Sequence, residues 1–261
     1  MPATELTAKP NWRTVDFISD LHLRAEDTDT ITAWQCYMQA TKADALFILG
    51  DLFEVWVGDD VLTQAAFEQQ CAAIIRQLSS RAAVFFMRGN RDFLVGQDLM
   101  AACGATMLND PTVLNFQRQR WLLSHGDGLC TDDTAYIAFR QQVRSADWQQ
   151  AFLAKPLTER QLIARSLRQQ SQTQYINRKK AGIADADVNA GAARELLLAA
   201  GAKTLIHGHT HKPAEYSLGD GLQRVVLSDW DLQALPARAQ VVRLTSAGLQ
   251  RISADEVISP H

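Results

Sequence analysis

The chain has 261 residues, of which 47% are hydrophobic and 21% are charged, and its formal net charge is −3. The length predicts one large domain, or one domain with an insertion. The apolar content excludes an intrinsically disordered chain. The acidic balance argues against a surface that binds nucleic acid, so we expect no nucleic-acid partner.

Short apolar runs, each followed by a polar cluster, recur along the chain and predict buried strands. The runs comprise residues 15–18, 45–49, 83–87, 121–123, 204–206, 224–227 and 241–244. Helical patterns separate the early runs, at residues 31–40, 62–78 and 97–103. The alternation of strand and helix predicts a layered α/β fold. Ligands of such folds bind beyond the carboxyl ends of the strands, where the polar clusters stand.

The pattern changes after Gly128, where apolar residues recur at helical spacing without a convincing strand. The groups are Tyr136, Phe139 and Val143, then Trp148 and Phe152, then Leu162, Ile163 and Leu167. We interpret residues 12–129 and 196–261 as the core, and residues 130–195 as a helical cap inserted over the strand ends.

The predicted cap carries a local surplus of basic side chains. Residues 155–180 hold one acid, Glu159, and the following bases: Lys155, Arg160, Arg165, Arg168, Arg178, Lys179 and Lys180. Such a run attracts a pyrophosphate headgroup or an anionic lipid surface. A solvated helix face is the ordinary alternative.

Cysteine usage and hydropathy bear on the compartment. The four cysteines, Cys36, Cys71, Cys103 and Cys130, form no C-x-x-C pair, which is typical of reduced thiols in the cytosol. The first twelve residues lack the apolar core of a signal peptide, and no run of 18 apolar residues occurs. We therefore expect a soluble protein, or one peripheral to a membrane.

Histidines gather in the polar clusters that follow the predicted strands. Those in clusters are His22, His125, His207, His209 and His211, whereas His261 stands at the terminus as an expected solvated residue. Together with Asp20, Asp51 and Asn90 they offer imidazole, carboxylate and amide donors, which suit Mn, Fe or Zn. Each motif is weak alone. The ordered set D-x-H, G-D, G-N-R-D, H-G-D and G-H-T-H, each after a strand, is hard to explain by packing.

This ordered set resembles the calcineurin-like metallophosphoesterase family. The resemblance implies a four-layer α/β/β/α sandwich with a dinuclear metal centre at the sheet ends. By motif, it implies that Asp20, His22 and His211 hold one metal, that Asn90, His125 and His209 hold the other, and that Asp51 bridges both. His207 precedes the last motif and is expected to be a buried residue outside the ligand set.

Arg91 stands where phosphomonoesterases of the family carry a histidine, in the motif G-N-H-[DE]. An arginine cannot act as a general acid near neutral pH, because its pKa is above ~12, but it can bind a phosphate bidentately. An alkoxide leaving group needs a proton, whereas a phosphate leaving group, with a second pKa of about 6, hardly does. The arginine therefore favours cleavage of a phosphoanhydride. A surface charge near the site is the alternative.

Longer strings around the motifs resemble the branch of the family that acts in lipid A biosynthesis. They span residues 50–60, 89–94, 125–133 and 207–213. The resemblance implies hydrolysis of UDP-2,3-diacylglucosamine at the phosphorus nearer uridine, with two Mn²⁺ per chain. It also implies a cytoplasmic monomer that binds a nucleotide-diphospho-glycolipid and lies at the anionic inner-membrane surface. The rival predictions are a nucleotide or cyclic-nucleotide phosphodiesterase of the same fold, and a scaffold without catalysis.

The same resemblance implies substrate contacts from both predicted domains. In the core these are Asn90, Arg91 and His209, and the cap contributes Asp133. Three further cap residues are expected at i, i+4 and i+7 on one helix face. Two alignments fit this spacing: Thr173, Asn177 and Lys180, or Ser171, Tyr175 and Arg178.

Overall fold

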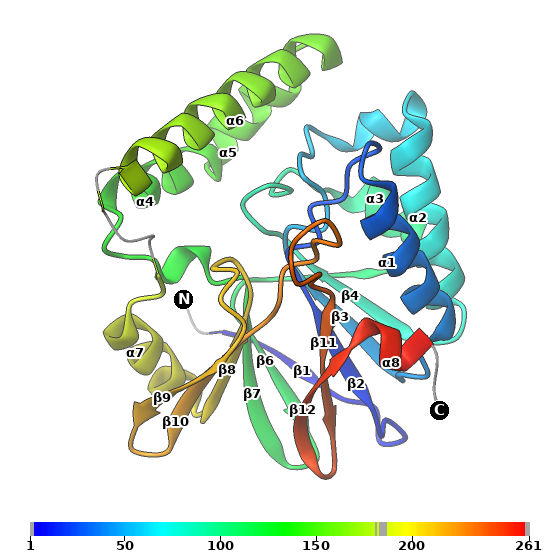
Figure 1. The fold of residues 1–261 in the computed structure, drawn as a ribbon, viewed down its shortest axis with the longest axis vertical. Helices are drawn as coiled ribbons and strands as arrows, with labels where there is room; N and C mark the ends of the chain where they lie inside the picture. Colours follow the sequence, from blue (N-terminus) through cyan, green and yellow to red (C-terminus); the bar gives the residue numbers. More distant parts are fainter. Residues whose placement is uncertain (1–2, 181, 183–186, 259–261) are drawn as a thin grey trace.

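The computed structural model describes residues 3–180, 182 and 187–258. Its named strands form two mixed six-stranded sheets (Figure 1). One sheet has the spatial order β12 (Gly248–Ser253), β11 (Gln240–Thr245), β2 (Val15–Ile18), β3 (Ala45–Leu49), β4 (Ala83–Met87) and β5 (Thr106–Leu108). The other has the order β1 (Thr4–Thr7), β6 (Thr112–Phe116), β7 (Gln119–Ser124), β8 (Thr204–His207), β10 (Leu222–Val226) and β9 (Glu215–Gly219).

The central strands of each sheet run parallel. In the first sheet Val15 of β2 pairs with Ala45 of β3, which pairs with Ala83 of β4. In the second sheet Trp121 of β7 pairs with Thr204 of β8. Parallel pairing brings the carboxyl ends of β2, β3 and β4 to one edge and those of β7 and β8 to another. Loops from these two edges meet at the candidate site described below.

The sheets pack face to face over a shared apolar cluster. Phe47 of β3 stacks on Phe85 of β4, with ring centroids 4.7 Å apart, and the same cluster includes Leu123 and Ile206 of the second sheet. Each of these strands reads as a continuous apolar run because both of its faces are covered.

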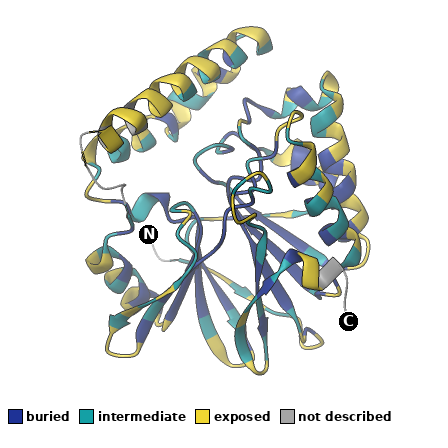
Figure 2. Cartoon of the chain, in the orientation of Figure 1, coloured by how far each residue is buried: buried dark blue, intermediate teal, exposed yellow. Residues whose placement is uncertain are grey.

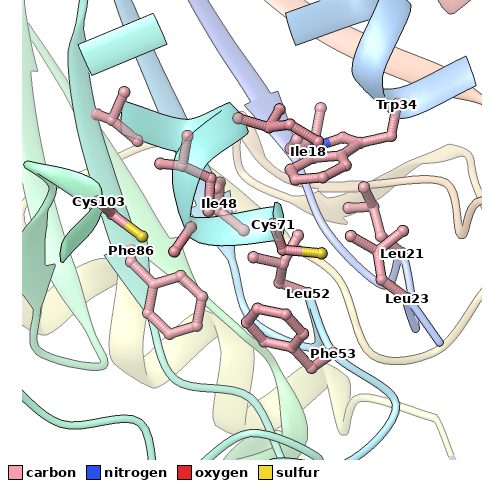
Figure 3. Close-up of a cluster of buried hydrophobic side chains, with 14 of the residues drawn as sticks. Ile18, Leu21, Leu23, Trp34, Ile48, Leu52, Phe53, Cys71, Phe86 and Cys103 are labelled. Atoms are coloured by element: carbon pink, nitrogen blue, oxygen red, sulfur yellow. The ribbon is translucent and has the colours of Figure 1, made fainter. Parts of the chain in front are cut away.

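Helices cover the outer face of each sheet. On the first sheet lie α1 (Thr28–Ala40), η1 (Asp59–Thr63), α2 (Ala66–Ser79) and α3 (Gln97–Cys103), and α8 (Ala254–Ile258) packs against α1. Figure 3 shows part of the cluster that they bury, including Trp34, Phe53 and Phe86. On the second sheet lies α7 (Ala190–Ala200), packed through Ala193 and Leu197. The predicted four-layer αββα arrangement is thus confirmed.

Helix ends follow from local sequence. The side chain of Asp27 accepts a hydrogen bond from N of Thr30 at the start of α1 (3.2 Å), and Asn189 does the same for N of Ala192 in α7 (3.0 Å). Helix α3 ends at Gly104, whose φ of 65° is left-handed. The helix predicted over 62–78 is two elements, η1 and α2.

Three helices form a further layer beyond the strand ends (Figure 1). They are α4 (Thr134–Val143), α5 (Ala146–Leu153) and α6 (Leu157–Lys180), and they follow the short η2 (Asp127–Leu129). Figure 2 shows that much of α6 is exposed, and Leu162 is 64% exposed. The division into core and cap stays a prediction. Its boundary at residue 195 falls inside α7, whose packing on the sheet favours a boundary before that helix.

Hydropathy of the helices bears on membrane insertion. Among the helices of the described residues, none combines the length and the apolar character that crossing a bilayer requires.

Candidate metal centre

Five of the seven predicted ligands have an unusual backbone conformation. Asp20, His22, Asp51, His209 and His211 have φ values between 48° and 69°. Residues with a Cβ rarely adopt this left-handed region, because the Cβ crowds the following carbonyl. Such conformations persist where the surrounding structure requires a particular side-chain direction. Here the five side chains turn toward a common space at the strand ends.

Motif glycines allow these loops to approach one another. A Cβ on Gly89 would lie 2.0 Å from Oδ1 of Asp51, and one on Gly208 would lie 2.2 Å from Oδ2 of Asp20. Both distances are below any real Cβ contact. The motifs G-N-R-D and G-H-T-H therefore contain glycine because the backbone of one loop packs against a ligand side chain of another.

Asp20, His22 and His211 come together as the first ligand group. Nε2 of His211 lies 3.4 Å from Oδ1 of Asp20 and 3.1 Å from Nε2 of His22. Oδ1 of Asp20 is buried, and within the described part of the chain it accepts no hydrogen bond. A buried carboxylate oxygen facing two imidazole nitrogens fits a cation, because an unpaired buried charge is costly.

Asn90, His125 and His209 form the second group. Oδ1 of Asn90 lies 2.9 Å from Nε2 of His125 and 2.8 Å from Nδ1 of His209. Nδ1 of His125 lies 2.9 Å from the carbonyl of Leu49, which can only accept, so Nδ1 carries the proton. In a neutral His125 the unprotonated Nε2 then faces another acceptor. A cation bound between Nε2 of His125 and Oδ1 of Asn90 would interact favourably with both lone pairs.

Asp51 faces both groups. Its Oδ2 lies 4.0 Å from Nε2 of His22, and its Oδ1 lies 3.7 Å from Nε2 of His125. The main-chain N of Arg91 donates to Oδ1 at 2.8 Å. One carboxylate oxygen is thus directed at each group, the placement that a bridging ligand needs. The donor set, oxygen and imidazole nitrogen, fits a dinuclear metal site.

The electrostatics of the histidines follow from burial and neighbouring charge. Burial lowers the pKa of His125, but the carboxylates of Asp51, Asp127 and Asp20 outweigh it and raise the pKa to about 9. Burial lowers the pKa of His209 to about 4, and the charge of His125 adds to that effect. His207 is buried with Nδ1 2.9 Å from the carbonyl of Gly208, and burial lowers its pKa to about 4.

Two motif aspartates that we did not assign hold the site loops together. The carboxylate of Asp92 accepts hydrogen bonds from N of Gly89 and N of Leu52, both at 2.8 Å, and so joins the loops after β4 and β3. Oδ2 of Asp127 accepts from Oη of Tyr136 and Nε of Arg140, both at 2.8 Å, which ties α4 to the end of β7. Both acids stand inside motifs, so their position was a usable signal.

Two further acids to which we assigned no role, Glu54 and Asp229, contact histidines of the predicted ligand set. Nδ1 of His22 lies 3.2 Å from Glu54, and Nδ1 of His211 lies 3.7 Å from Asp229. Burial would raise the pKa of Glu54, but its close contact with His22 and the charges of His22, Arg168 and Arg91 lower it to about 2.

A cavity of about 1280 Å³ extends from the metal centre to the cap. Polar residues from the strand ends form its floor: His22, Asp51, Asn90, Arg91 and His209. Apolar residues of α4, α5 and α6 form its wall: Phe139, Val143, Trp148, Phe152, Ala164 and Leu167. Nε of Arg91 is buried and has no hydrogen-bond partner among the described residues. The cavity therefore combines an anion-binding floor with an apolar wall.

The predicted cap contacts are only partly placed at this cavity. Ser171, Asn177 and Asp133 line it, whereas Thr173 and Lys180 are not among its described lining residues. Oγ1 of Thr173 donates to the carbonyl of Gln169 in its own helix, at 2.9 Å. The side chains of Tyr175 and Arg178, like residue His261, lie outside the described part of the chain. Each predicted alignment thus contributes one residue to the described lining of the cavity: Asn177 from the first and Ser171 from the second.

Comparison with known proteins identifies the class of this fold and site. Residues 13–213 match the family described as calcineurin-like phosphoesterase. The chain therefore belongs to the calcineurin-like phosphoesterase family.

Within that family the sequence is similar to proteins named UDP-2,3-diacylglucosamine hydrolase. One, from Chromobacterium violaceum, is 48% identical over 225 residues, which cover 83% of this chain and 90% of that protein. Another, from Chromohalobacter salexigens, is 44% identical over 233 residues, which cover 87% and 91% respectively. Among solved structures, an archaeal phosphodiesterase has a TM-score of 0.44 at 11% identity, covering 92% of this chain and 98% of its own.

Proposed function

We propose that this chain hydrolyses the pyrophosphate of UDP-2,3-diacylglucosamine at the phosphorus nearer uridine, releasing UMP and 2,3-diacylglucosamine 1-phosphate. The observation that carries the proposal is the cavity, where Arg91 and the predicted metal ligands lie beneath an apolar wall from the cap. A nucleotide-diphospho-glycolipid presents the matching features, a pyrophosphate beside acyl chains. The names of the relatives indicate the same substrate.

The roles of the site residues follow from their positions. A pair of bound divalent cations would supply Lewis acidity and a more acidic water for attack on phosphorus. Asp20, His22 and His211 would hold one cation, Asn90, His125 and His209 the other, and Asp51 both. Arg91 would bind a phosphate oxygen bidentately and neutralise charge that builds up on the pyrophosphate. Because the departing group is a phosphate, no residue has to protonate it.

The donor set also supports the choice of metal. Carboxylate and amide oxygens suit manganese, whereas imidazoles are shared with iron and zinc sites. Three of the seven predicted ligands, Asp20, Asp51 and Asn90, supply such oxygens, and none of the seven is a cysteine. We propose two Mn²⁺ per chain as the working metals.

Cap composition supports a peripheral membrane location. Helix α6 exposes basic residues, among them Arg165, Lys179 and Lys180, beside the exposed apolar residues Leu162 and Ile176. Basic and apolar side chains on one exposed helix suit binding to an anionic lipid surface. We propose a monomer at the cytoplasmic face of the inner membrane, taking its lipid substrate from that surface and binding no nucleic acid.

The direct test is incubation of purified, Mn²⁺-loaded protein with UDP-2,3-diacylglucosamine in ¹⁸O-labelled water, with the products analysed by mass spectrometry. We expect UMP and 2,3-diacylglucosamine 1-phosphate, with the label in UMP.

Asp51→Ala should abolish turnover with an unchanged circular dichroism spectrum, and near-normal turnover would refute the bridging role. Equal turnover of deacylated UDP-glucosamine would refute acyl recognition. Faster cleavage of a soluble diester would favour a phosphodiesterase.

A further inference from the structure

The two ligand groups differ in what supports their histidines. In the first group, Nδ1 of His22 lies 3.2 Å from Oε2 of Glu54, an ion-pair contact that does not have hydrogen-bond geometry. In the second group, Nδ1 of His125 faces the neutral carbonyl of Leu49. A carboxylate partner orients an imidazole more strongly than a carbonyl does and makes its other nitrogen a better metal ligand.

Glu54 is itself held on both carboxylate oxygens. Its Oε1 lies 2.5 Å from Nε of Arg168 on α6, while Oε2 faces His22. The side chain of Glu54 is only 17% exposed, so this pair is partly shielded from solvent. The chain thus forms a continuous series of contacts from the cap, through Arg168 and Glu54, to a predicted metal ligand.

Main-chain hydrogen bonds fix the same two loops relative to each other. N of Leu23 donates to the carbonyl of Leu52 at 2.8 Å, and N of Glu54 donates to the carbonyl of Leu23 at 3.1 Å. Leu23 follows His22 directly, so the backbone sets where the Glu54 carboxylate meets the imidazole. The contact is therefore built into the fold rather than left to a mobile surface side chain.

We propose that Glu54 is the positioning residue of His22, that its contact with Nδ1 orients the imidazole so that Nε2 faces His211 and Asp20, and that Arg168 holds Glu54 in this role from the cap. This proposal shares one assumption with the proposed function, namely that Asp20, His22 and His211 bind a divalent cation, and it rests on no other part of that function. Arg168 also lines the cavity, so the proposal predicts that a ligand bound against the cap affects the geometry of this cation site.

The test is Mn²⁺ binding to chelator-treated protein without substrate, with free Mn²⁺ measured by electron paramagnetic resonance. We expect Glu54→Ala to weaken one of the two sites by about 10- to 100-fold and to leave the other unchanged. Glu54→Gln should weaken the same site less, because its amide oxygen can occupy the same place beside Nδ1 of His22 without the negative charge. Glu54→Asp should restore part of the affinity, and Arg168→Met should weaken the same site.

The matched control is Glu195→Gln, which removes a carboxylate from the exposed face of α7 and should leave both sites unchanged. Unchanged binding in both Glu54→Ala and Glu54→Gln would overturn the proposal. Equal weakening of both sites would also overturn it, since Glu54 would then act on the fold rather than on His22. If the Glu54→Ala variant does not fold, the Mn²⁺ affinity of the Glu54→Gln variant alone tests the proposal. A protein that binds Mn²⁺ as expected but leaves UDP-2,3-diacylglucosamine intact would refute the proposed substrate alone.

Discussion

At the scale of single residues, Arg91 lies beside the candidate metal centre and bears on the type of bond that we propose the site hydrolyses, a phosphoanhydride. Its main-chain N donates to Asp51, so the carboxylate that we propose as the bridging ligand holds its backbone, while its side chain lines the cavity. A guanidinium remains charged at any physiological pH and therefore neutralises phosphate without donating a proton. An arginine at this position therefore suits a leaving group that is a weak base and needs no proton, such as a phosphate.

We expect Arg91→Ala to lower kcat/KM by about 100-fold, from the loss of a charge-assisted contact to phosphate, with the Mn²⁺ content unchanged. Arg91→Lys should recover only part, since an ammonium cannot bind bidentately. Steady-state kinetics and metal analysis check both variants. Arg118→Ala, in the exposed turn between β6 and β7, is the control. An unchanged rate and KM in Arg91→Ala would remove this residue from the site.

His125 predicts how the stability of the metal-free protein depends on pH. Its pKa is about 9 in the fold, against about 6.5 in an unfolded chain. Because the folded pKa is raised, protonated His125 stabilises the fold fully below pH ~6.5, and this contribution is lost as the pH rises through 9. Metal binding, which requires an unprotonated imidazole, strengthens over the same interval.

For chelator-treated protein we expect the free energy of unfolding, measured in urea, to decrease between pH 6.5 and pH 9. His125→Gln should flatten that decrease, because it removes the titrating group. A profile for the unsubstituted metal-free protein that is flat over this interval would contradict the assignment of a raised pKa.

At the scale of elements, one buried arginine fastens the start of α6 to the core. Arg160 is 2% exposed, and its Nη1 donates to the carbonyl of Val57 at 2.5 Å and to Oδ1 of Asp60 at 2.9 Å. Its Nε donates to the carbonyl of Lys155 at 3.0 Å. Most of α6 is otherwise exposed (Figure 2). Arg160 is thus the buried polar contact that holds the apolar wall, beside the packing of Leu157, Ile163 and Ala164 against the core cluster.

We expect Arg160→Met to destabilise the protein by about 2 kcal/mol, from the loss of hydrogen bonds made by a charged group. It should also raise KM for the acylated substrate, because α6 carries part of the cavity wall. Arg118→Met, in the exposed turn between β6 and β7, is the control for charge. Urea unfolding and substrate kinetics provide the two measurements. A KM equal to that of the control would show that Arg160 does not hold the wall in place.

At the scale of the whole molecule, the candidate metal centre joins the two sheets. Asp20, Asp51 and Asn90 follow strands of the first sheet, whereas His125 and the histidines at 209 and 211 follow strands of the second. The apolar cluster between the sheets lies along the strands, and the ligands lie beyond their ends. Cations bound there would act as a cross-link at one end of the sandwich.

Removal of metal by a chelator should therefore loosen that end selectively. We expect faster amide hydrogen exchange in residues 19–23, 50–53, 89–92, 125–128 and 207–211, with the β11–β12 hairpin unchanged. Mn²⁺ at 100 times its Kd should restore about 2.7 kcal/mol of stability. Asp51→Ala, which lacks the predicted bridge, should respond much less. Exchange that rises uniformly across both sheets would contradict a cross-linking role.

Sequence pattern alone predicted the central strands and the layered class, because continuous apolar runs between polar clusters are a local signal. The predicted bounds of β2, β3, β4 and α3 agree with the structure. The sequence pattern did not predict the strands β1, β5, β6, β9 and β12. Strand β9 alternates intermediate and exposed residues, and β1 is mostly exposed and pairs with β6 from more than a hundred residues away. Short or exposed strands of this kind carry little hydrophobic pattern, and their pairing is not local.

The identities of seven candidate ligands also came from the sequence, since each stands in a short motif at a strand end. Only the tertiary structure showed that Glu54 and Asp229 contact His22 and His211, because these contacts join loops that are distant in the chain. It likewise placed Ser171, and not Thr173, at the cavity. The spacing of residues specifies which side chains share a helix face, but the rotation of that helix about its axis is set by packing against the rest of the molecule.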